Sequence, residues 1–229
     1  MLKCWIKSNS LLIIIKMNSL ERLIEIYKVR RDEIQRRLSE FKKILSESNR
    51  RIFAELAFCI CTPQSKAKNC WEIISSLMKN GLLFNGNEEQ IKPFLNSIRF
   101  GENKAKYIVN ARRLFTEDDT LKIKEKIQLF NDPFKLREWL VENILGIGMK
   151  EASHFLRNIG LGKDFAILDR HILKNLKEFN VIKDIPKSIS KKVYLDIENK
   201  MREFSKQINI PMDELDLLLW SKETGIIFK

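Results

Sequence analysis

Lys150 and Asp169 are the residues of this sequence whose types and positions best suit chemistry. Lys150 lies in "LGIGMKEASHFLRNIG", in the first turn of an expected helix, where the positive end of the helix dipole disfavours a charged ammonium. A neutral amine is a nucleophile suited to Schiff-base formation. Asp169 lies in "AILDRHIL", at another expected helix start, where the dipole and free N–H groups keep a carboxylate ionised.

This amine and this carboxylate form a working pair if the chain brings them opposite each other. The amine would attack a sugar carbon while the carboxylate steadies the positive charge that develops there. Each residue also has an ordinary explanation. Lys150 could be a solvated lysine, at a cost of about 0.3 kcal/mol for its unfavourable position, and Asp169 could be a helix N-cap.

The elements that must position Lys150 are two helices expected over 134–144 and 149–159, joined by "LGIG". Gly146 and Gly148 are two of only eight glycines, and both can adopt the positive φ angles of a sharp turn. Free N–H groups at the start of the second helix favour phosphate. The pattern predicts a helix-hairpin-helix motif over about 134–160, although an ordinary tight helix–helix turn explains the glycines equally well.

The rest of the chain also reads as helices. Apolar residues recur at helical spacing, strand signals are scarce, and there are only five prolines. The sequence therefore predicts an all-α protein. Further helices are expected over 19–47, 51–62, 67–80, 88–97, 103–115, 169–180, 190–208 and 211–225.

Composition points towards a polyanionic partner. The net charge is +12 and the isoelectric point is about 9.5, which suits nucleic acid, although a solvated lysine-rich surface is the alternative. The four cysteines do not form the paired clusters of a zinc or iron–sulfur site, and a reducing, intracellular setting is expected. Residues 1–16 contain an apolar run too short to span a bilayer, and are expected to be a dispensable extension or a short interfacial anchor.

The motifs "GIGMKEASHFLRN" and "AILDRHIL" resemble the helix-hairpin-helix DNA glycosylase superfamily. Within it they are most similar to the archaeal and bacterial 8-oxoguanine DNA glycosylase/AP lyases of the second type. "FAELAFCICT", "KAKYIVNAR", "LREWLVENI" and "ELDLLLWSKETGIIFK" extend the likeness, which runs from about Met17 to Lys229.

The resemblance implies a fold of two helical subdomains with the active-site cleft between them. Residues 17–60 together with 165–229 would form the terminal subdomain. Residues 61–164 would form a helical bundle that ends in the helix-hairpin-helix. Double-stranded DNA containing 8-oxoguanine would be the partner of a cytoplasmic, nucleoid-associated prokaryotic monomer, with no membrane involved.

The resemblance also implies a mechanism. A damaged guanine is flipped out of the stack, Lys150 attacks C1′ and displaces it, and Asp169 helps to deprotonate the amine and stabilises the oxocarbenium-like transition state. The Schiff base on Lys150 then permits β-elimination, which cuts the strand 3′ to the lesion. No metal or other cofactor is required, although a monovalent cation could sit on hairpin carbonyls near 145–148.

Other roles carry over residue by residue. Trp220 matches the aromatic residue that stacks on the flipped base, Phe100 matches the opposite stacking face, and His154, one helical turn beyond Lys150, would face the base pocket. The terminal carboxylate of Lys229 would accept the N–H that 8-oxoguanine has at N7 and guanine lacks. Gln64 would enter the gap left by the flipped base, and Gly146 and Gly148 would approach the DNA backbone.

Alternatives stay open for several of these residues. Trp220 could simply pack in a core, Gln64 could be a loop residue that caps the next helix, and His154 could be structural. Arg99, Lys104, Lys106, Arg112 and Arg113 could contact phosphates or form a solvated helix face. For the whole chain, the alternatives are a related glycosylase for another damaged base and a non-catalytic DNA-binding protein.

Overall fold

The computed structural model describes residues 19–229, and the expected extension over 1–16 lies outside the described residues. Most of the described chain is helical and its strands are limited to one short hairpin, which confirms the all-α prediction. It divides into two compact units. The elements in chain order are α2 (Ser19–Ile44), α3 (Asn49–Cys61), α4 (Ala67–Lys79), α5 (Leu82–Asn85), α6 (Glu88–Ile91), the 3-10 helix η1 (Lys92–Leu95), α7 (Gly101–Leu114), β1 (Thr116–Glu117), β2 (Thr120–Leu121), α8 (Ile123–Gln128), α9 (Pro133–Asn143), α10 (Met149–Asn158), α11 (Arg170–Glu178), α12 (Lys191–Gln207) and α13 (Met212–Thr224).

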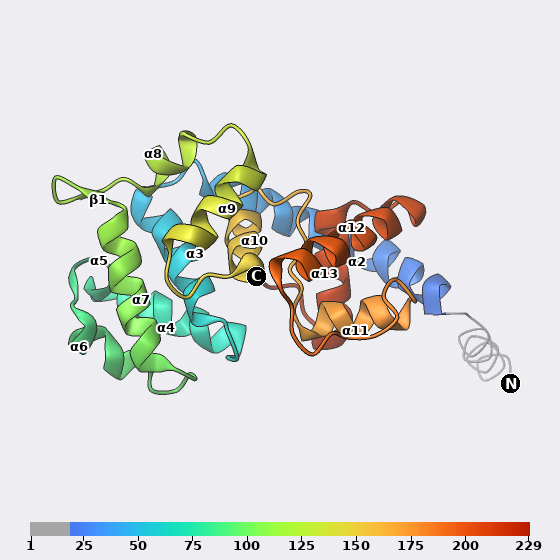
Figure 1. The fold of residues 1–229 in the computed structure, drawn as a ribbon, viewed down its shortest axis with the longest axis horizontal. Coiled ribbons are helices and arrows are strands. Elements are labelled where there is room, and N and C mark those ends of the chain that lie inside the picture. The colour runs from blue at the N-terminus through green and yellow to red at the C-terminus, as the bar shows by residue number, and fades with distance from the viewer. Residues whose placement is uncertain (1–18) are drawn as a thin grey trace, which may run out of the picture. The chain divides into compact units, whose positions relative to one another are not determined.

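The larger unit comprises residues 38–167 and Lys229, and is built around α3. Ser48 caps this helix by accepting the N–H of Arg51, and every side chain from Ile52 to Cys61 is buried. A helix buried on all sides needs neighbours all round, and α3 packs against α4, α7, α8 and α10 (Figure 1). This unit carries the expected helix-hairpin-helix.

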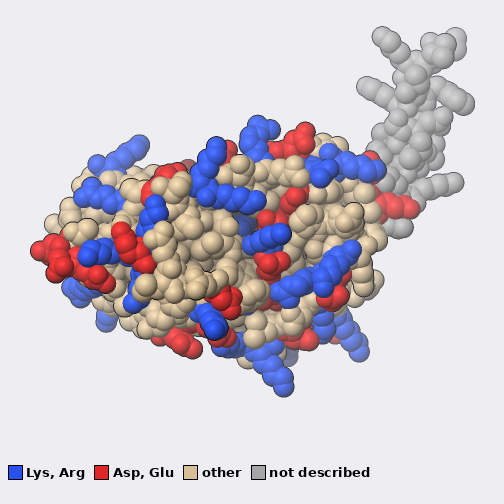
Figure 2. All heavy atoms as spheres, turned by 90° about the horizontal axis from the view of Figure 1, so that it is seen from above, with Lys and Arg blue, Asp and Glu red and all other residues tan. Residues whose placement is uncertain are grey.

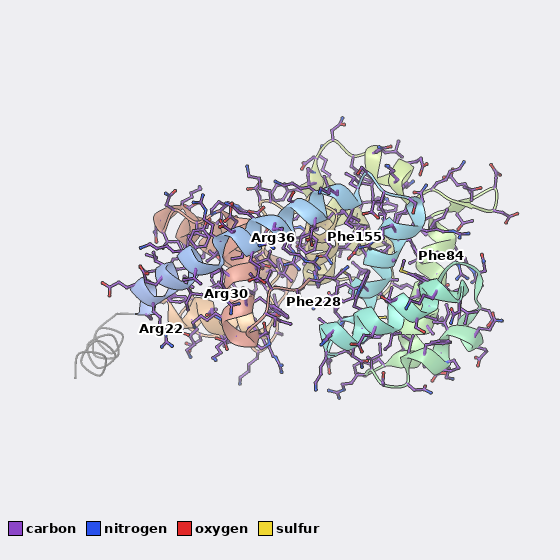
Figure 3. The ribbon with its side chains drawn as sticks, turned by 180° about the vertical axis from the view of Figure 1, so that it is seen from behind. Arg22, Arg30, Arg36, Phe84, Phe155 and Phe228 are labelled. Atoms are coloured by element: carbon purple, nitrogen blue, oxygen red, sulfur yellow. The ribbon has the colours of Figure 1, made fainter. Side chains whose placement is uncertain are left out.

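The second unit comprises residues 19–37 together with residues 168–228. Helix α13 lies at its centre and packs against α11 and α12. Two arginines of α2 hold the residues after α13, because Arg30 donates to the carbonyl of Gly225 at 3.1 Å and Arg37 donates to that of Phe228 at 2.7 Å. Figure 3 labels Arg30 and Phe228.

The boundary between the units differs from the expected one. Residues 38–60, which we expected in the terminal subdomain, belong to the larger unit. The physical reason is that α3 buries its apolar surface against helices of that unit, and the chain divides inside the continuous helix α2. Periodicity alone could not show this, because it predicts a buried face without saying which helix covers it.

Two local features also differ from the expectation. The helix expected over 88–97 is divided into α6 and the 3-10 helix η1, which contains Pro93, a residue that lacks the N–H needed to continue an α-helical ladder. A two-stranded antiparallel hairpin, β1–β2, follows α7. Its turn residues Asp118 and Asp119 both have positive φ, as a type I′ hairpin turn requires.

The basic charge is dispersed over the surface. On the face shown in Figure 2, Lys and Arg side chains occur throughout, with acidic side chains among them. Among residues 19–229, no helix has the length and apolar character needed to cross a membrane.

Candidate active site

The predicted helix-hairpin-helix is present as α9, a five-residue turn over 144–148 and α10, and the helix ends lie within one residue of the expected boundaries. Gly146 has a φ of 81° and lies so close to Tyr107 that a β-carbon there would overlap the ring. Gly148 differs from the expectation, because its φ of −101° and ψ of −174° are extended. The turn therefore requires a positive φ at one of the two glycines, and Gly148 serves as the N-cap residue of α10.

Arg137 joins the two helices of this motif from inside the unit. Its side chain is buried, and its Nη1 donates to the Ser153 hydroxyl on α10 at 3.1 Å. The guanidinium lies 4.2 Å from the centre of the Phe165 ring. The hydrogen bond thus joins α9 to α10, and the ring contact joins α9 to the segment that follows α10.

Lys150 is the second residue of α10, and its Nζ lies 3.0 Å from Oε1 of Glu151. The other oxygen of Glu151 accepts the N–H of Gly148 at 3.2 Å. One carboxylate thus bridges the candidate nucleophile and the hairpin amide that we expected to be open to phosphate. Glu151 was not among the predicted site residues, although a Glu three residues after an N-cap is the capping-box signal that could have indicated it.

Asp169 is the N-cap of α11, as its position predicted. Its Oδ1 accepts the N–H groups of His171 at 2.8 Å and Ile172 at 2.9 Å. Both bonds end on the same oxygen, Oδ1. The other oxygen, Oδ2, has no hydrogen-bond partner among residues 19–229. Asp169 lies in the unit of residues 168–228, and Lys150 lies in the unit of residues 38–167.

His154 lies one helical turn after Lys150 and is only 5% exposed. Burial lowers the pKa of His154 well below the ordinary value of 6.5, and the charges of Arg157, Lys150 and Lys229 lower it further. A hydrogen bond with the main chain of Lys229 raises the pKa and offsets a small part of this lowering, and the ring meets Phe58 edge-on at 5.4 Å. The buried imidazole is therefore neutral at neutral pH.

Lys229 is held by its side chain within the same unit. Its ammonium forms an ion pair with the buried Glu55, and lies 3.3 Å from the centre of the Trp71 ring. Glu55 also accepts hydrogen bonds from Arg51 at 2.6 Å and Asn158 at 3.0 Å. Sequence reasoning missed Glu55 and Trp71, because contacts across such sequence separations leave no local signal.

The remaining candidates are distributed between the units. Gln64 and Phe100 lie in the unit of Lys150, and both are exposed with positive φ values of 53° and 58°. The Arg99 guanidinium lies 5.5 Å from the centre of the Phe100 ring. Trp220, on α13, is half-buried and shares the unit of Asp169.

Two of the basic residues considered for phosphate contact point inward. Lys104 is 3% exposed, and Arg112 donates to the carbonyls of Leu83 at 3.1 Å and Gly86 at 2.6 Å. These side chains are used for main-chain carbonyls inside the unit, so the phosphate interpretation is wrong for both. Their regular spacing on α7 could not distinguish an inward from an outward face.

The three described cysteines act as buried side chains. Burial raises the pKa of Cys70 to about 11, and the pKa values of Cys59 and Cys61 are raised further by the same cause. Thiols held neutral in this way are poor metal ligands. Within residues 19–229, no group of three or more His, Cys, Asp or Glu side chains is placed to hold a metal ion.

Comparison with known proteins identifies the family. The family model described as 8-oxoguanine DNA glycosylase matches residues 34–210. A protein of Fusobacterium nucleatum named 8-oxoguanine DNA glycosylase/AP lyase is 48% identical over 206 residues, which is 90% of this chain and 95% of the relative.

Solved structures agree with this match. A crystal structure of the Methanocaldococcus jannaschii 8-oxoguanine glycosylase/lyase, in complex with a 15mer DNA containing 8-oxoguanine, has a TM-score of 0.79 and 39% identity. The match covers 90% of this chain and 99% of the Methanocaldococcus jannaschii chain. The structure of the Thermotoga maritima 8-oxoguanine DNA glycosylase has a TM-score of 0.78 and 34% identity. That match covers 92% of this chain and 98% of the Thermotoga maritima chain. A helical fold, a glycine hairpin that presents a lysine, and these similarities in sequence and structure together place the chain in the helix-hairpin-helix family of 8-oxoguanine DNA glycosylases.

Proposed function

We propose that this protein excises 8-oxoguanine from double-stranded DNA and then cuts the strand as an AP lyase. The observation that carries the proposal is the position of Lys150 in the first turn of α10, directly after the glycine hairpin of a family member. Binding alone does not require an amine at this place, because the hairpin can hold a phosphate through its main chain.

The chemistry assigned to Lys150 begins with attack of Nζ on C1′ of the sugar. The bond between C1′ and the base breaks, and its electron pair leaves with the base. The ring then opens to a Schiff base between Nζ and C1′, which acidifies the C2′ proton. Loss of that proton expels the 3′ phosphate by β-elimination, so the strand is cut 3′ to the lesion.

Asp169 supplies a carboxylate for the positive charge that develops on the sugar, and accepts a proton from the amine. Its Oδ1 is held by two N–H groups of α11, and its Oδ2 is the atom assigned to these tasks. Because Oδ1 is fixed, Oδ2 of the same carboxylate is also oriented before the substrate arrives.

Four of the predicted residues are assigned to the extruded base. Phe100 and Trp220 supply aromatic faces for stacking, His154 supplies a neutral imidazole, and the terminal carboxylate of Lys229 accepts the N–H at N7 of 8-oxoguanine. Gln64 fills the gap left in the duplex. No cofactor enters this scheme, and a monovalent cation on the hairpin carbonyls is a further proposal.

The test is borohydride trapping on duplex DNA with one 8-oxoguanine. Lys150→Gln is expected to abolish the covalent adduct and to slow base release by about a thousandfold, since the nucleophile is lost. Lys206→Gln is the matched control, because Lys206 also pairs with a nearby glutamate, at 2.9 Å. An adduct that survives in the Lys150 variant shows that another amine reacts.

The same assay separates this activity from its rivals. Excision of an oxidised pyrimidine in preference to 8-oxoguanine would assign a different lesion to the protein. Tight DNA binding by the wild-type protein, with neither excision nor adduct on any of these substrates, would make it a binding protein only.

A further inference from the structure

Lys104 is a buried lysine that the assigned chemistry does not use. It lies on α7, and its Nζ is 2.7 Å from the carbonyl oxygen of Cys61, 2.8 Å from that of Pro63 and 3.1 Å from the hydroxyl of Ser65. An ammonium has three N–H donors, and here three acceptors meet them. All of these residues belong to the same unit.

This arrangement is unusual because the charge has no acidic partner. No carboxylate among the described residues lies within ion-pair distance of Lys104, and burial lowers its pKa. A buried charge is costly, so its carbonyl partners must offset the lost hydration. Part of that compensation comes from α3, which ends at Cys61, where the negative end of the helix dipole attracts a cation.

The carbonyls bound by Lys104 belong to a tight turn over 62–65. The N–H of Ser65 donates to the carbonyl of Thr62 at 3.0 Å, Pro63 occupies the second position, and Gln64 the third with a φ of 53°. These features match a type II turn, which favours glycine or asparagine at its third position. Glutamine is strained there, and surrounding contacts must hold it in place.

Lys104 binds the atom that decides the type of this turn. Types I and II differ in the orientation of the peptide between the second and third residues, and Pro63 contributes the carbonyl of that peptide. By holding this oxygen inward, the ammonium keeps Gln64 at positive φ, with its side chain exposed. The hydroxyl of Ser65, which donates to the same oxygen at 3.3 Å, supports this orientation.

We propose that Lys104 is a positioning residue that sets the peptide between Pro63 and Gln64, and thereby presents Gln64 to the DNA duplex. The proposal rests on the proposed function, in which Gln64 fills the gap left by the flipped base. Lys104 itself touches neither DNA nor the reacting atoms. It acts through the turn, and its own N–H also holds the carbonyl of Phe100 at 3.0 Å.

The test compares Lys104→Met with Gln64→Ala and with the double variant. We expect each single variant to weaken binding to duplex DNA with 8-oxoguanine, and to slow excision, by about tenfold, and the double variant to be no worse. Binding measured by fluorescence anisotropy needs no chemistry, so this result is independent of whether the base is released.

A second substrate separates positioning from general damage to the fold. A single-stranded oligonucleotide with an abasic site has no gap to fill, so its borohydride adduct with Lys150 is expected to change less than about twofold in Lys104→Met. Lys124→Met is the matched control, because Lys124 also donates to main-chain carbonyls after a helix, those of Ser46 at 3.2 Å and Glu47 at 3.3 Å. This control should match the wild type on both substrates.

Two results overturn the proposal. In one, the losses of duplex affinity multiply in the double variant; in the other, Lys104→Met loses as much activity on the single-stranded substrate as on the duplex. Should Lys104→Met fail to fold, Ser65→Ala removes one acceptor, and an unchanged duplex affinity for this variant also overturns it. Failure of the proposed function looks different, since the wild-type protein would then form no adduct on either substrate.

Discussion

The ammonium of Lys150 lies 3.0 Å from a carboxylate oxygen of its sequence neighbour, Glu151. The same carboxylate accepts the N–H of the hairpin residue Gly148. The nucleophile assigned to this protein is therefore held in an ion pair, which it must leave before its nitrogen can reach a sugar carbon.

We predict that Glu151→Gln forms the borohydride-trapped adduct about two to three times faster, because the amine no longer has to leave an ion pair before it reaches the sugar. The amide can still accept the N–H of Gly148, so the hairpin should keep its shape. Single-turnover trapping on abasic DNA measures the rate. A slower reaction would show that Glu151 orients the amine or accepts its proton.

Asp169→Asn is expected to slow base release by about a hundredfold with little loss of thermal stability, since asparagine is an equally good N-cap but carries no charge. Ser190→Ala is the companion variant. Ser190 caps α12 by accepting the N–H of Val193, and its loss should cost about 1 kcal/mol of stability without affecting excision. If Asp169→Asn excises as fast as the wild type, Asp169 is a cap only.

Gly146→Ala should destabilise the fold by about 2–3 kcal/mol, because it combines a positive φ with overlap of the Tyr107 ring. Gly225→Ala separates these two effects. Gly225 has a φ of 82° with open space around it, so only backbone strain of about 1 kcal/mol is expected. Chemical denaturation measures the free energy of unfolding of both variants. Equal losses of stability in the two would mean that the Tyr107 ring moves aside freely.

His154 should make the protein less stable in weak acid. Its folded pKa is depressed below the ordinary 6.5, so the unfolded chain binds the proton more readily. The stability that neutral His154 contributes is complete above pH 6.5 and is lost as the pH falls below this value. The loss is about 1.4 kcal/mol per pH unit while the folded imidazole stays neutral.

His154→Leu should remove this slope between about pH 5 and 6.5, as measured by denaturant unfolding across the range. His171→Gln serves as the comparison, because His171 is the only other histidine in the sequence. A slope that persists in His154→Leu would assign the acid sensitivity to another group.

The sequence predicted what local rules determine. The hairpin, the start of α10 and the cap at Asp169 depend on residues within one or two helical turns, and all three are found as expected. The second glycine was misjudged because a glycine can serve as an N-cap as well as a positive-φ residue, and spacing does not separate the two roles.

What could not be predicted depends on long-range packing. The inward direction of Lys104, the ion pair of Lys229 with Glu55 and the membership of α3 in the larger unit all follow from contacts between distant segments. Glu151 is the exception, because its spacing from Gly148 was visible in the sequence and was overlooked.

The buried carboxylate of Glu55 also has a consequence for how the protein is made. Its lysine partner follows 174 residues later in the chain. At about 5–20 residues per second, a ribosome needs roughly ten to thirty seconds to deliver that partner after Glu55 itself has been added. Throughout this interval Glu55, a buried residue of α3, lacks its lysine partner. We therefore expect chaperones to bind the nascent chain before Lys229 is added.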